Sequence, residues 1–465
     1  MDVEEFVRHR MDEGFCNDDI VIKLASHIKR IKSVTPAYAE SFARAVMQEV
    51  ENTRGLTGDF FSYERSGVRM GDLGVGSRGT GDFFAHRQIA RIIGRTSASV
   101  GVDEMDDAGA VLLGSRGKAV NKNDLQKTSE VSKPGAEGPY IVCTVDGMHS
   151  RLSDFPFLAG FHVTRATLRD VYVMGAHPVM LFSDIHVADD GDVAKIFDYT
   201  AGITAVGEVM DVPLVTGSTL RIGGDMVLGS RMTGCVGAVG VARHLTARKE
   251  TRPGDVILMT EGAGGGTIAT AALYSGFPEV VDATVNLNFL LASEALLASD
   301  ALISIHSMTD VTNGGLRGDV YEMAETAGCR IVIEETKVGS LVEPAVAKML
   351  LELSIDYLGV SLDALLITAP RSAVPAITDI IRGTGVTIRE IGRVEEGKPE
   401  SVLVVDGVEQ DFTPRFREAA YTPLKKVVES QRCDFEEMKM KVRRAADAAI
   451  DKKQRVIERI KPESS

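Results

Sequence analysis

The chain has 465 residues, of which 44 % are hydrophobic and 25 % charged, the balance of a soluble globular protein, and its formal net charge is −14. The length predicts two to three domains, and the acidic balance argues against binding along a nucleic-acid backbone. No run approaches the roughly 18 uninterrupted apolar residues of a membrane span, and the acidic N-terminus is unlike a signal peptide. The five cysteines are scattered and include no Cys-x-x-Cys pair. We therefore expect a cytoplasmic protein with reduced thiols and with no nucleic-acid or membrane partner.

The first part of the chain has the pattern of helices and contains no strand-like run. Asn17, followed by two aspartates, can cap an amphipathic helix through Ile31, and Thr35-Pro36 can open a second helix through about Val50. Residues 1–58 are therefore expected to form a helical extension.

Beyond Ile93 the pattern changes to β-branched apolar runs that alternate with longer amphipathic segments, which predicts an α/β fold. A polar stretch at 121–138 is expected to be a surface loop. The turn at Thr251-Arg-Pro-Gly-Asp opens a second unit of the same style, so we expect domains at 59–245 and 246–408. Strands are expected at 110–113, 140–145, 179–185, 212–216, 235–241, 255–260, 330–334, 364–369, 388–394 and 401–405.

From Phe412 to Lys461 the chain becomes helical again, charged and rich in Lys, Arg, Glu and Ala. Heptad-like apolar positions in this region indicate packing against the body or against a partner subunit. We assign residues 409–465 to a C-terminal helical extension.

Three segments place acids beside apolar elements. Asp106 and Asp107 precede a strand, and adjacent carboxylates repel unless a cation or protons intervene, so the pair is either a solvated loop pair or part of a metal site. Asp146 ends the apolar run that includes Thr144, where a metal ion could bridge it to phosphates. Asp170 lies in an otherwise apolar helix, where an unpaired buried carboxylate would be costly.

Other motifs carry polar or flexible groups. His149, just after Asp146, is either a substrate contact or a satisfied loop histidine. The glycines of Thr-Asp-Val-Thr-Asn-Gly-Gly at 309–315 turn the chain into a helix whose N-terminal N–H groups can bind an anion. The glycine cluster at 74–82 is neither a Walker A loop nor a dinucleotide fingerprint. The cluster at 262–267 either holds a substrate phosphate or is a plain strand-to-helix turn.

In order and spacing, these motifs resemble the AIR synthase superfamily of ATP-using enzymes, over roughly residues 70–405. The group includes aminoimidazole ribonucleotide synthase, thiamine-monophosphate kinase, selenophosphate synthetase and a hydrogenase-maturation protein. The resemblance implies a two-domain α/β (α+β) fold and a homodimer in which the N-terminal domains pair into a shared β-barrel. It also implies ATP and Mg²⁺ as cofactors, and ATP-dependent activation or phosphorylation of an oxygen of a small-molecule substrate.

The resemblance assigns roles to single residues of this chain. Residues 106–111 resemble a Gly-Asp-Asp-Ala-Ala-Val signature, 144–149 a Thr-Thr-Asp motif, and 169–178 an Asn-Asp-x-x-x-x-Gly-Ala-x-Pro element. The glycine cluster at 74–82 resembles a mobile segment that closes over ATP. Metal ligands would be Asp107, Asp146 and Asp310; nucleotide-binding residues would be Asp107, Thr144, Asp146, Asp170, Gly217, Ser218, Arg248, Thr312 and Gly314; catalytic residues would be His149 and Asp170.

The chain also departs from the family pattern. Ser218 and Asn313 each stand where thiamine-monophosphate kinase has an acid. Either Asp225, in the next turn, replaces the acid at Ser218, or the site holds fewer metal ions. None of the named members fits the whole chain. The alternative is a nucleotide-binding scaffold or maturation-type accessory protein without its own turnover, with the helical termini recruiting a protein partner.

Overall fold

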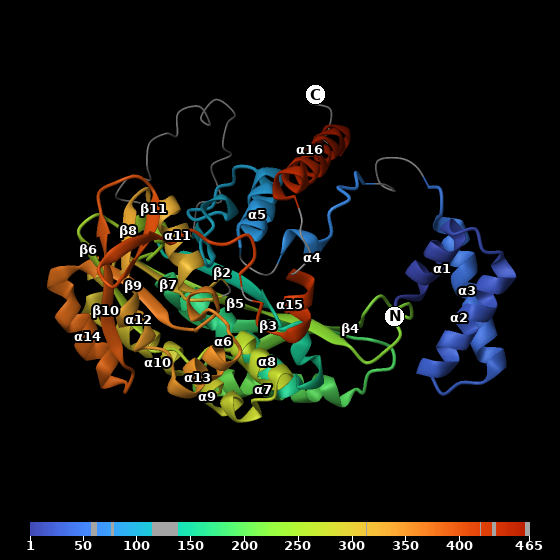
Figure 1. Cartoon of the computed structure of the whole chain (residues 1–465), viewed down its shortest axis with the longest axis horizontal. Helices are drawn as coiled ribbons and strands as arrows, with labels where there is room; N and C mark the ends of the chain where they lie inside the picture. The colour runs from blue at the N-terminus through green and yellow to red at the C-terminus, as the bar shows by residue number, and fades with distance from the viewer. Residues whose placement is uncertain are drawn as a thin grey trace.

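The computed structural model describes residues 1–56, 63–75, 79–113, 138–312, 314–418, 420–429 and 434–460. It consists of a small N-terminal helical bundle, a larger body with two β-sheets, and C-terminal helices that fold back on the body (Figure 1). The loop predicted at 121–138 lies outside the described residues except for its last one.

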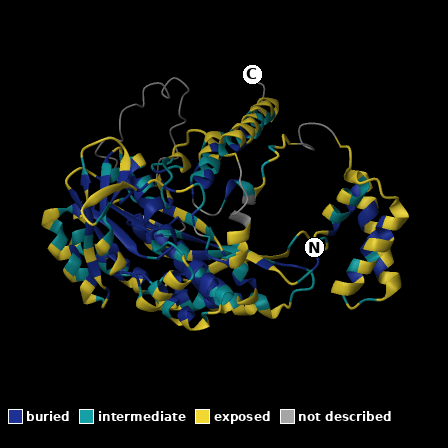
Figure 2. Cartoon of the chain, in the orientation of Figure 1, coloured by how far each residue is buried: buried dark blue, intermediate teal, exposed yellow. Residues whose placement is uncertain are grey.

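The N-terminal bundle comprises α1 (Val3–Asp12), α2 (Asn17–Ile31) and α3 (Pro36–Thr53). Thr35 caps α3 as predicted, because its side chain accepts a hydrogen bond from the Tyr38 N–H. The predicted cap of α2 is wrong in detail: Asn17 is the first helical residue, so the following acids lie in the first turn, where the helix dipole favours them. Figure 2 shows the buried inner faces and exposed outer faces of the three helices.

The bundle rests on the turn between two strands of the body. Its small apolar core takes in Leu228 from that turn. The Val3 N–H donates to the Met226 carbonyl over 3.0 Å, and Lys32 Nζ lies 2.8 Å from Asp190 Oδ1. The bundle is therefore joined to the body by backbone hydrogen bonds, a charge pair and apolar contact.

The first sheet has five strands in the order β1-β2-β5-β3-β4, antiparallel except for the β3–β4 pair. One face is covered by two helices, α6 (Pro156–Val173) and α7 (Ala194–Val209). The opposite face carries exposed apolar side chains, among them Val145 at 59 % and Val241 at 38 % exposure. The strands are β1 (Gly109–Leu112), β2 (Tyr140–Gly147), β3 (His177–Val187), β4 (Leu214–Arg221) and β5 (Met232–Ala242).

The second sheet has seven strands in the order β12-β11-β8-β10-β6-β9-β7, of which only β11 and β8 run parallel. Val256 and Leu258 of β6 enter one core and Ile257 and Met259 the other, so both faces of the sheet are covered by helices. The strands are β6 (Asp255–Thr260), β7 (Ser307–Asp310), β8 (Arg330–Glu334), β9 (Leu365–Pro370), β10 (Ile388–Glu395), β11 (Glu400–Val405) and β12 (Val408–Asp411). The covering helices are α10 (Asn288–Leu297) and α14 (Val374–Gly383) on one face, and α8 (Gly266–Ser275), α11 (Gly315–Ala327) and α13 (Pro344–Glu352) on the other.

The stretch Pro278–Leu297 is long and apolar enough to cross a membrane by length and composition. In the structure it is divided between a short 3₁₀ turn, α9 (Val281–Thr284) and α10, and half of its most apolar window is buried. Phe289 and Leu290 of α10 belong to the core of the body, which accounts for the apolar composition.

Helix α6 lies between the two sheets and is buried on nearly every side. Leu168 and Val171 share one hydrophobic core with Val256 and Leu258 of the second sheet. The expected two-sheet α/β architecture is confirmed, and its two domains share this helix as a common wall.

The C-terminal segment returns across the body through α15 (Pro423–Glu429) and α16 (Phe435–Ile460). α16 packs on α5 (Thr80–Ile93), where Arg91 Nη2 lies 2.6 Å from Asp447 Oδ1 and Lys453 Nζ donates to the Ile92 carbonyl. The C-terminal helices were predicted to pack against the body or against a partner subunit, and in this structure they pack against the body.

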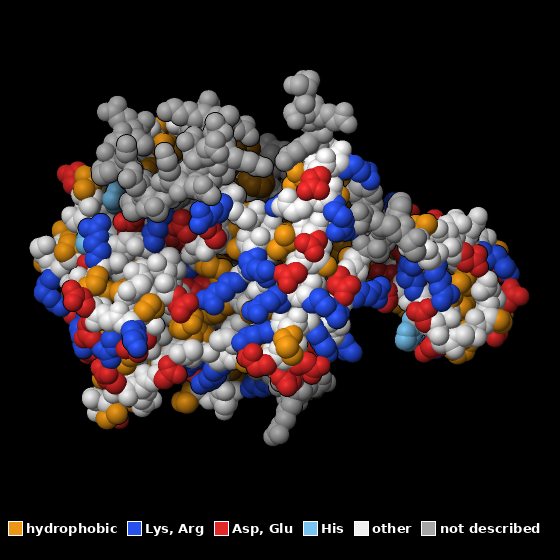
Figure 3. All heavy atoms as spheres, turned by 90° about the horizontal axis from the view of Figure 1, so that it is seen from above, with side chains coloured by type: hydrophobic (Ala, Val, Ile, Leu, Met, Phe, Trp, Pro, Cys, Tyr) orange, Lys and Arg blue, Asp and Glu red, His pale blue; other side chains and the backbone are white. Residues whose placement is uncertain are grey.

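Basic and acidic side chains are interspersed over the described part of the face seen in Figure 3.

Candidate active site

Arg248 organises one side of the junction between the two domains. Its guanidinium is 1 % exposed and lies 2.6 Å from Asp107 Oδ1, 2.7 Å from Glu322 Oε2 and 3.3 Å from Asp319 Oδ1. The Thr309 hydroxyl donates to Asp107 Oδ2 over 2.6 Å and accepts from Arg248. Burial alone would lower the pKa of Arg248, but the surrounding carboxylates raise it well above its ordinary value. Arg248 is therefore a permanent cation that fixes Asp107 in place.

Asp106 binds backbone N–H groups, whereas Asp107 binds the arginine side chain. Its two carboxylate oxygens accept hydrogen bonds from the Asp107 N–H over 3.0 Å and from the Arg248 N–H over 2.9 Å. Burial, with the charge of Asp107 adding to it, raises the pKa of Asp106 to about 7. The pair is thus not a solvated loop pair: Asp106 ties two backbone segments together and Asp107 faces the arginine.

Asp310 and Asp363 form a second charged cluster with two arginines of α6. Arg169 Nε lies 3.1 Å from Asp310 Oδ2, and both Arg169 and Arg165 pair with Asp363. Arg165 also donates to the carbonyl oxygens of Thr284 and Gly264, each over 2.7 Å. Burial would raise the pKa of Asp363, but the two arginines hold it well below its usual range.

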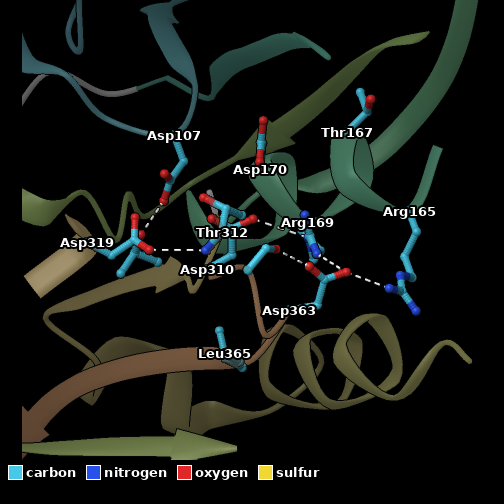
Figure 4. Close-up of polar contacts among 12 residues, drawn as sticks. Asp107, Arg165, Thr167, Arg169, Asp170, Asp310, Thr312, Asp319, Asp363 and Leu365 are labelled. Atoms are coloured by element: carbon cyan, nitrogen blue, oxygen red, sulfur yellow. Dashed lines mark hydrogen bonds and ion pairs between the residues drawn. The ribbon is translucent and has the colours of Figure 1, made fainter. Parts of the chain in front are cut away.

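Asp170 lies close to three other acids of the site. Its Oδ2 accepts a hydrogen bond from the Thr144 hydroxyl over 2.9 Å. Burial raises its pKa well above the ordinary value, and the charges of Asp146, Asp310 and Asp107 add to that shift. The structure therefore gathers the predicted acids around one place, where an added cation would relieve their repulsion (Figure 4).

The described acidic side chains of the site are not arranged as metal ligands. Among the described residues, no group of three or more His, Cys, Asp or Glu side chains is arranged so that it could hold a metal ion. Asp107 and Asp310 each face an arginine instead. The assignment of Asp107, Asp146 and Asp310 as metal ligands stays a prediction. So does the contact of Arg248 with ATP, because the guanidinium is occupied by protein carboxylates here.

A cavity of about 110 Å³ lies beside these acids, between α6 and the start of α8. His149 forms part of its wall, with Nε2 3.1 Å from the Thr267 hydroxyl and Nδ1 3.2 Å from the Thr270 hydroxyl. Burial, helped by Lys425, lowers the pKa of His149 to about 4, so its imidazole is neutral at neutral pH. The lining residues are Asp146, Gly147, His149, His162, Val163, Ala166, Arg169, Asp170, Gly266, Thr267, Thr312, Ser361 and Asp363.

The glycine cluster at 262–267 forms one wall of the cavity. Gly264 has a φ of +74°, and a Cβ atom on Gly265 would overlap the Asp363 carboxylate and Arg165. A Cβ atom on Gly266 would lie 3.2 Å from the His149 ring. Glycine is therefore required here by the close approach of the loop to the charged cluster, whether or not the loop also binds phosphate.

The segment 309–315 reaches the same place. The Thr312 N–H donates to Asp319 Oδ2 over 3.0 Å, and Thr312 lines the cavity. Gly314, with a φ of +103°, precedes the first residue of α11. The structure thus brings Thr312 and Asp310 to the site, whereas Asn313 lies outside the described residues.

Gly217 and Ser218 lie away from the cluster of acids. Both are exposed on β4, the edge strand, and the sheet order places β4 three strands from β2, roughly 14 Å at the usual strand spacing. Asp225 lies in the exposed turn after β4 and pairs with Arg221, beside the N-terminal bundle. Within one chain, Asp225 therefore does not replace the acid that Ser218 lacks.

The glycine segment at 74–82 is described only in part. Residues 76–78 lie outside the description, while Gly79 and Gly81 pack tightly against the backbone and ring of Phe416. The Thr80 N–H donates to the Arg415 carbonyl over 3.0 Å. This side of the segment is thus held by the C-terminal part of the chain.

Several site residues were not predicted from the sequence. Arg165, Arg169, Asp319, Glu322 and Asp363 all take part in the charged clusters. Charged residues on an apolar helix were a usable signal for the two α6 arginines, since buried charges occur in pairs.

Comparisons with known proteins cover the body and, in one case, nearly the whole chain. The description "AIR synthase related protein, N-terminal domain" matches residues 106–242, and "AIR synthase related protein, C-terminal domain" matches residues 252–405. An uncharacterized protein of Methanocaldococcus jannaschii is 49 % identical over 474 aligned positions, covering 99 % of this chain and 98 % of the relative.

Two further matches are more distant. The selenide, water dikinase of Geobacter metallireducens is 32 % identical over 247 positions, which cover 51 % of this chain and 68 % of that enzyme. The crystal structure of the hydrogenase maturation protein HypE in complex with ATP superposes with a TM-score of 0.52 at 19 % identity, covering 64 % of this chain and 91 % of the other. This last likeness is one of fold.

Proposed function

Because the chain belongs to the AIR synthase-related family, we propose that it uses Mg²⁺–ATP to activate or phosphorylate an oxygen atom of a small-molecule substrate. Relatives named selenide, water dikinase and thiamine-monophosphate kinase support ATP as the co-substrate. The observation that carries the proposal is the position of Asp170, a half-buried residue of the cavity wall with three other acids close enough to raise its pKa.

The chemistry of these acids suits a divalent cation, although the described side chains are not arranged as metal ligands in this structure. Carboxylate oxygens suit Mg²⁺, and a cation among the acids would lower the pKa of Asp170, which burial and the neighbouring acids raise. Asp146 and Asp170, which both line the cavity, are the first candidates to hold it. When bound there, Mg²⁺–ATP would supply a transferable phosphoryl group, and the metal would offset the negative charge that develops on the phosphate oxygens.

The arginines keep the surrounding acids in fixed positions. Arg248 holds Asp107, and Arg169 holds Asp310 and Asp363, so these carboxylates are oriented before any ligand arrives. Fixed charges that need no rearrangement at the moment of reaction are the usual source of electrostatic stabilisation in enzymes. Asp146 and Asp170 line the cavity, so a cation that enters it would meet these two acids.

The substrate's reacting group would lie in the cavity. A neutral His149 cannot serve as a strong base, because its pKa of about 4 lies far below neutral pH. It can instead orient the substrate by a hydrogen bond, together with the Thr267 hydroxyl beside it. His149 is therefore assigned to substrate positioning, and Asp170 to the nucleotide side.

The protein would act as a homodimer through the uncovered face of the first sheet. Val145 and Val241 are exposed apolar residues on that face, and an exposed apolar sheet of this kind is expected to be covered by a partner. Two such faces placed together would form the shared β-barrel that the family resemblance implies.

A second candidate function is nucleotide binding without turnover. It is favoured by Ser218, which supplies no acid, and by the arginines that occupy Asp107 and Asp310. Catalysis remains the first choice because Asp146 and Asp170 line a cavity large enough for a reacting group.

Isothermal calorimetry with ATP, with and without millimolar Mg²⁺, tests binding. A ligand at a hundredfold excess over its Kd adds about 2.7 kcal/mol to stability, so thermal shift offers a second readout. The absence of Mg²⁺-dependent binding would contradict both candidate functions. Binding without release of ADP or AMP, when candidate acceptors are supplied one by one, would favour the scaffold.

A further inference from the structure

Residues 412–418 and 420–427, here called the strap, lie beyond the matched C-terminal domain yet reach His149, a residue of the cavity wall. Tyr421 is 4 % exposed, and its hydroxyl lies 3.3 Å from His149 Nε2. The two rings meet edge to face, with centroids 5.7 Å apart. A residue from outside the family domains therefore contacts the one histidine predicted to touch substrate.

The strap is anchored by a buried ion pair. Arg317 Nη1 donates to both oxygens of Glu418, over 3.1 and 2.9 Å, while Nη2 donates to Asp356 Oδ2 over 2.6 Å. The Arg415 N–H donates to Glu418 Oε1 over 2.7 Å. A Cβ atom on Gly359 would overlap the Glu418 carboxylate, so the second domain leaves room for it. These contacts place Tyr421 at a defined position.

The hydrogen bonds around His149 set its tautomer. Burial raises the pKa of the Tyr421 phenol above its ordinary value, so the hydroxyl keeps its proton and can donate. A neutral imidazole accepts at one nitrogen and donates at the other. If Nε2 accepts from Tyr421, the ring proton is on Nδ1, which lies 3.2 Å from the Thr270 hydroxyl.

We propose that Tyr421 is a positioning residue that holds His149 as the Nδ1–H tautomer, and that the strap keeps Tyr421 in place against this residue of the cavity wall. The single Nε2 lone pair would then accept from Tyr421 or from the nearby Thr267 hydroxyl, so a substrate N–H or O–H could bind Nε2 only by displacing that donor. This proposal depends on the proposed function in one respect, namely that the cavity receives the substrate.

The size of the cavity limits that group. A cavity of about 150 Å³ holds benzene, so one of about 110 Å³ accepts only a smaller polar fragment. The cavity would therefore admit only a small hydrogen-bond-donating end of the substrate, while the remainder of the molecule stays outside.

The tautomer can be read from nuclear magnetic resonance of the full chain labelled with ¹⁵N in histidine rings. His149→Gln identifies the His149 signals among those of the nine histidines. The parent protein should show a protonated Nδ1 and an unprotonated Nε2 at His149. Tyr421→Phe, which removes only the hydroxyl, should shift His149 toward the Nε2–H form.

Tyr357→Phe is the matched control, because the Tyr357 hydroxyl is bonded to Glu335 in the second domain. It should leave the His149 signals unchanged. A protonated Nε2 in the parent, or identical His149 signals in parent and Tyr421→Phe, would overturn the positioning role. The measurement needs no nucleotide, so a failure of Mg²⁺–ATP binding would count against the proposed function alone.

Glu418→Gln tests the anchoring of the strap. Weakening the anchor should raise hydrogen exchange over residues 415–427 by about tenfold or more, as expected for a segment that opens locally. Glu390→Gln, at an exposed pair with Arg371, is the control. Unchanged exchange over the strap in Glu418→Gln would overturn its anchoring by Arg317.

Discussion

Arg248 Nη2 lies 2.6 Å from Asp107 Oδ1, and neither side chain is more than 2 % exposed. The two residues are 141 positions apart in the chain. Asp107 precedes the first sheet and Arg248 precedes the second, so this one pair ties the domains together at the acidic site. The contribution of this pair to stability can be measured by removing the arginine, which leaves the buried carboxylates without a cation.

Arg248→Gln should destabilise the protein by about 3–5 kcal/mol, because Asp107, Asp319 and Glu322 would remain buried without their cation. Urea unfolding followed by circular dichroism measures the loss. Arg371→Gln, which removes an exposed arginine paired with Glu390, should leave the midpoint unchanged. Equal effects of the two substitutions would show that the Arg248 cluster contributes no more than a surface pair.

Asp146→Asn should keep the fold and weaken Mg²⁺–ATP binding by more than about tenfold, since one charge is removed at nearly constant shape. Asp225→Asn is the matched control, because Asp225 lies in an exposed turn and pairs with Arg221. Calorimetry on both variants decides the matter. Parent-like binding by Asp146→Asn would make Asp146 a structural residue.

Stability should depend on pH through the acids of the site. The folded-state pKa of Asp106 is about 7 against an ordinary 3.8, so between these values the folded chain holds a proton that the unfolded chain has released. The contribution of such a group is full below about pH 4 and is lost as the pH rises through 7. The free energy of unfolding of the ligand-free protein, measured in urea, should therefore fall across this range.

Asp170 shifts in the same direction, so its substitution should show the effect directly. Asp170→Asn keeps an acceptor for the Thr144 hydroxyl but removes the titrating carboxyl group. At pH 8 the ligand-free variant should melt a few degrees above the parent, with a weaker dependence on pH, while its response to Mg²⁺–ATP is lost. A lower melting temperature at pH 8 would contradict the assignment of uncompensated charge to Asp170.

The proposed dimer depends on the open face of the first sheet. The double substitution Val145→Lys and Val241→Lys should give a monomer by light scattering, because like charges would line the contact on both copies. Val408→Lys, at a similarly exposed valine on β12, is the control and should leave a dimer. A dimer that survives the double substitution would place the interface elsewhere.

The positions of most strands in both sheets could be predicted from the sequence, whereas the packing of the two sheets against each other could not. β6 at 255–260 and β8 at 330–334 begin and end where expected, because their apolar runs are bounded by turn residues. The short strands β7 and β12 were not predicted. Each has four residues, too few to show a period of two.

In the site, the acids were predictable and their partners were not. Asp146 and Asp170 occur in recognisable motifs, whereas Asp363 lies in a loop whose sequence shows nothing unusual. Its pairing with Arg165 and Arg169 depends on how α6 packs against the second domain. The contact of Tyr421 with His149 depends in the same way on a chain reversal that local sequence does not encode.

The burial of α6 between the sheets has a consequence for how the molecule loses its structure. A fragment that ends near residue 250 would leave Leu168, Val171 and the two α6 arginines without their counterparts. A fragment that begins there would lack the helix that covers Val256 and Leu258. Neither half is then an autonomous folding unit, and heat should melt both sheets in a single cooperative transition, with the N-terminal bundle free to melt on its own.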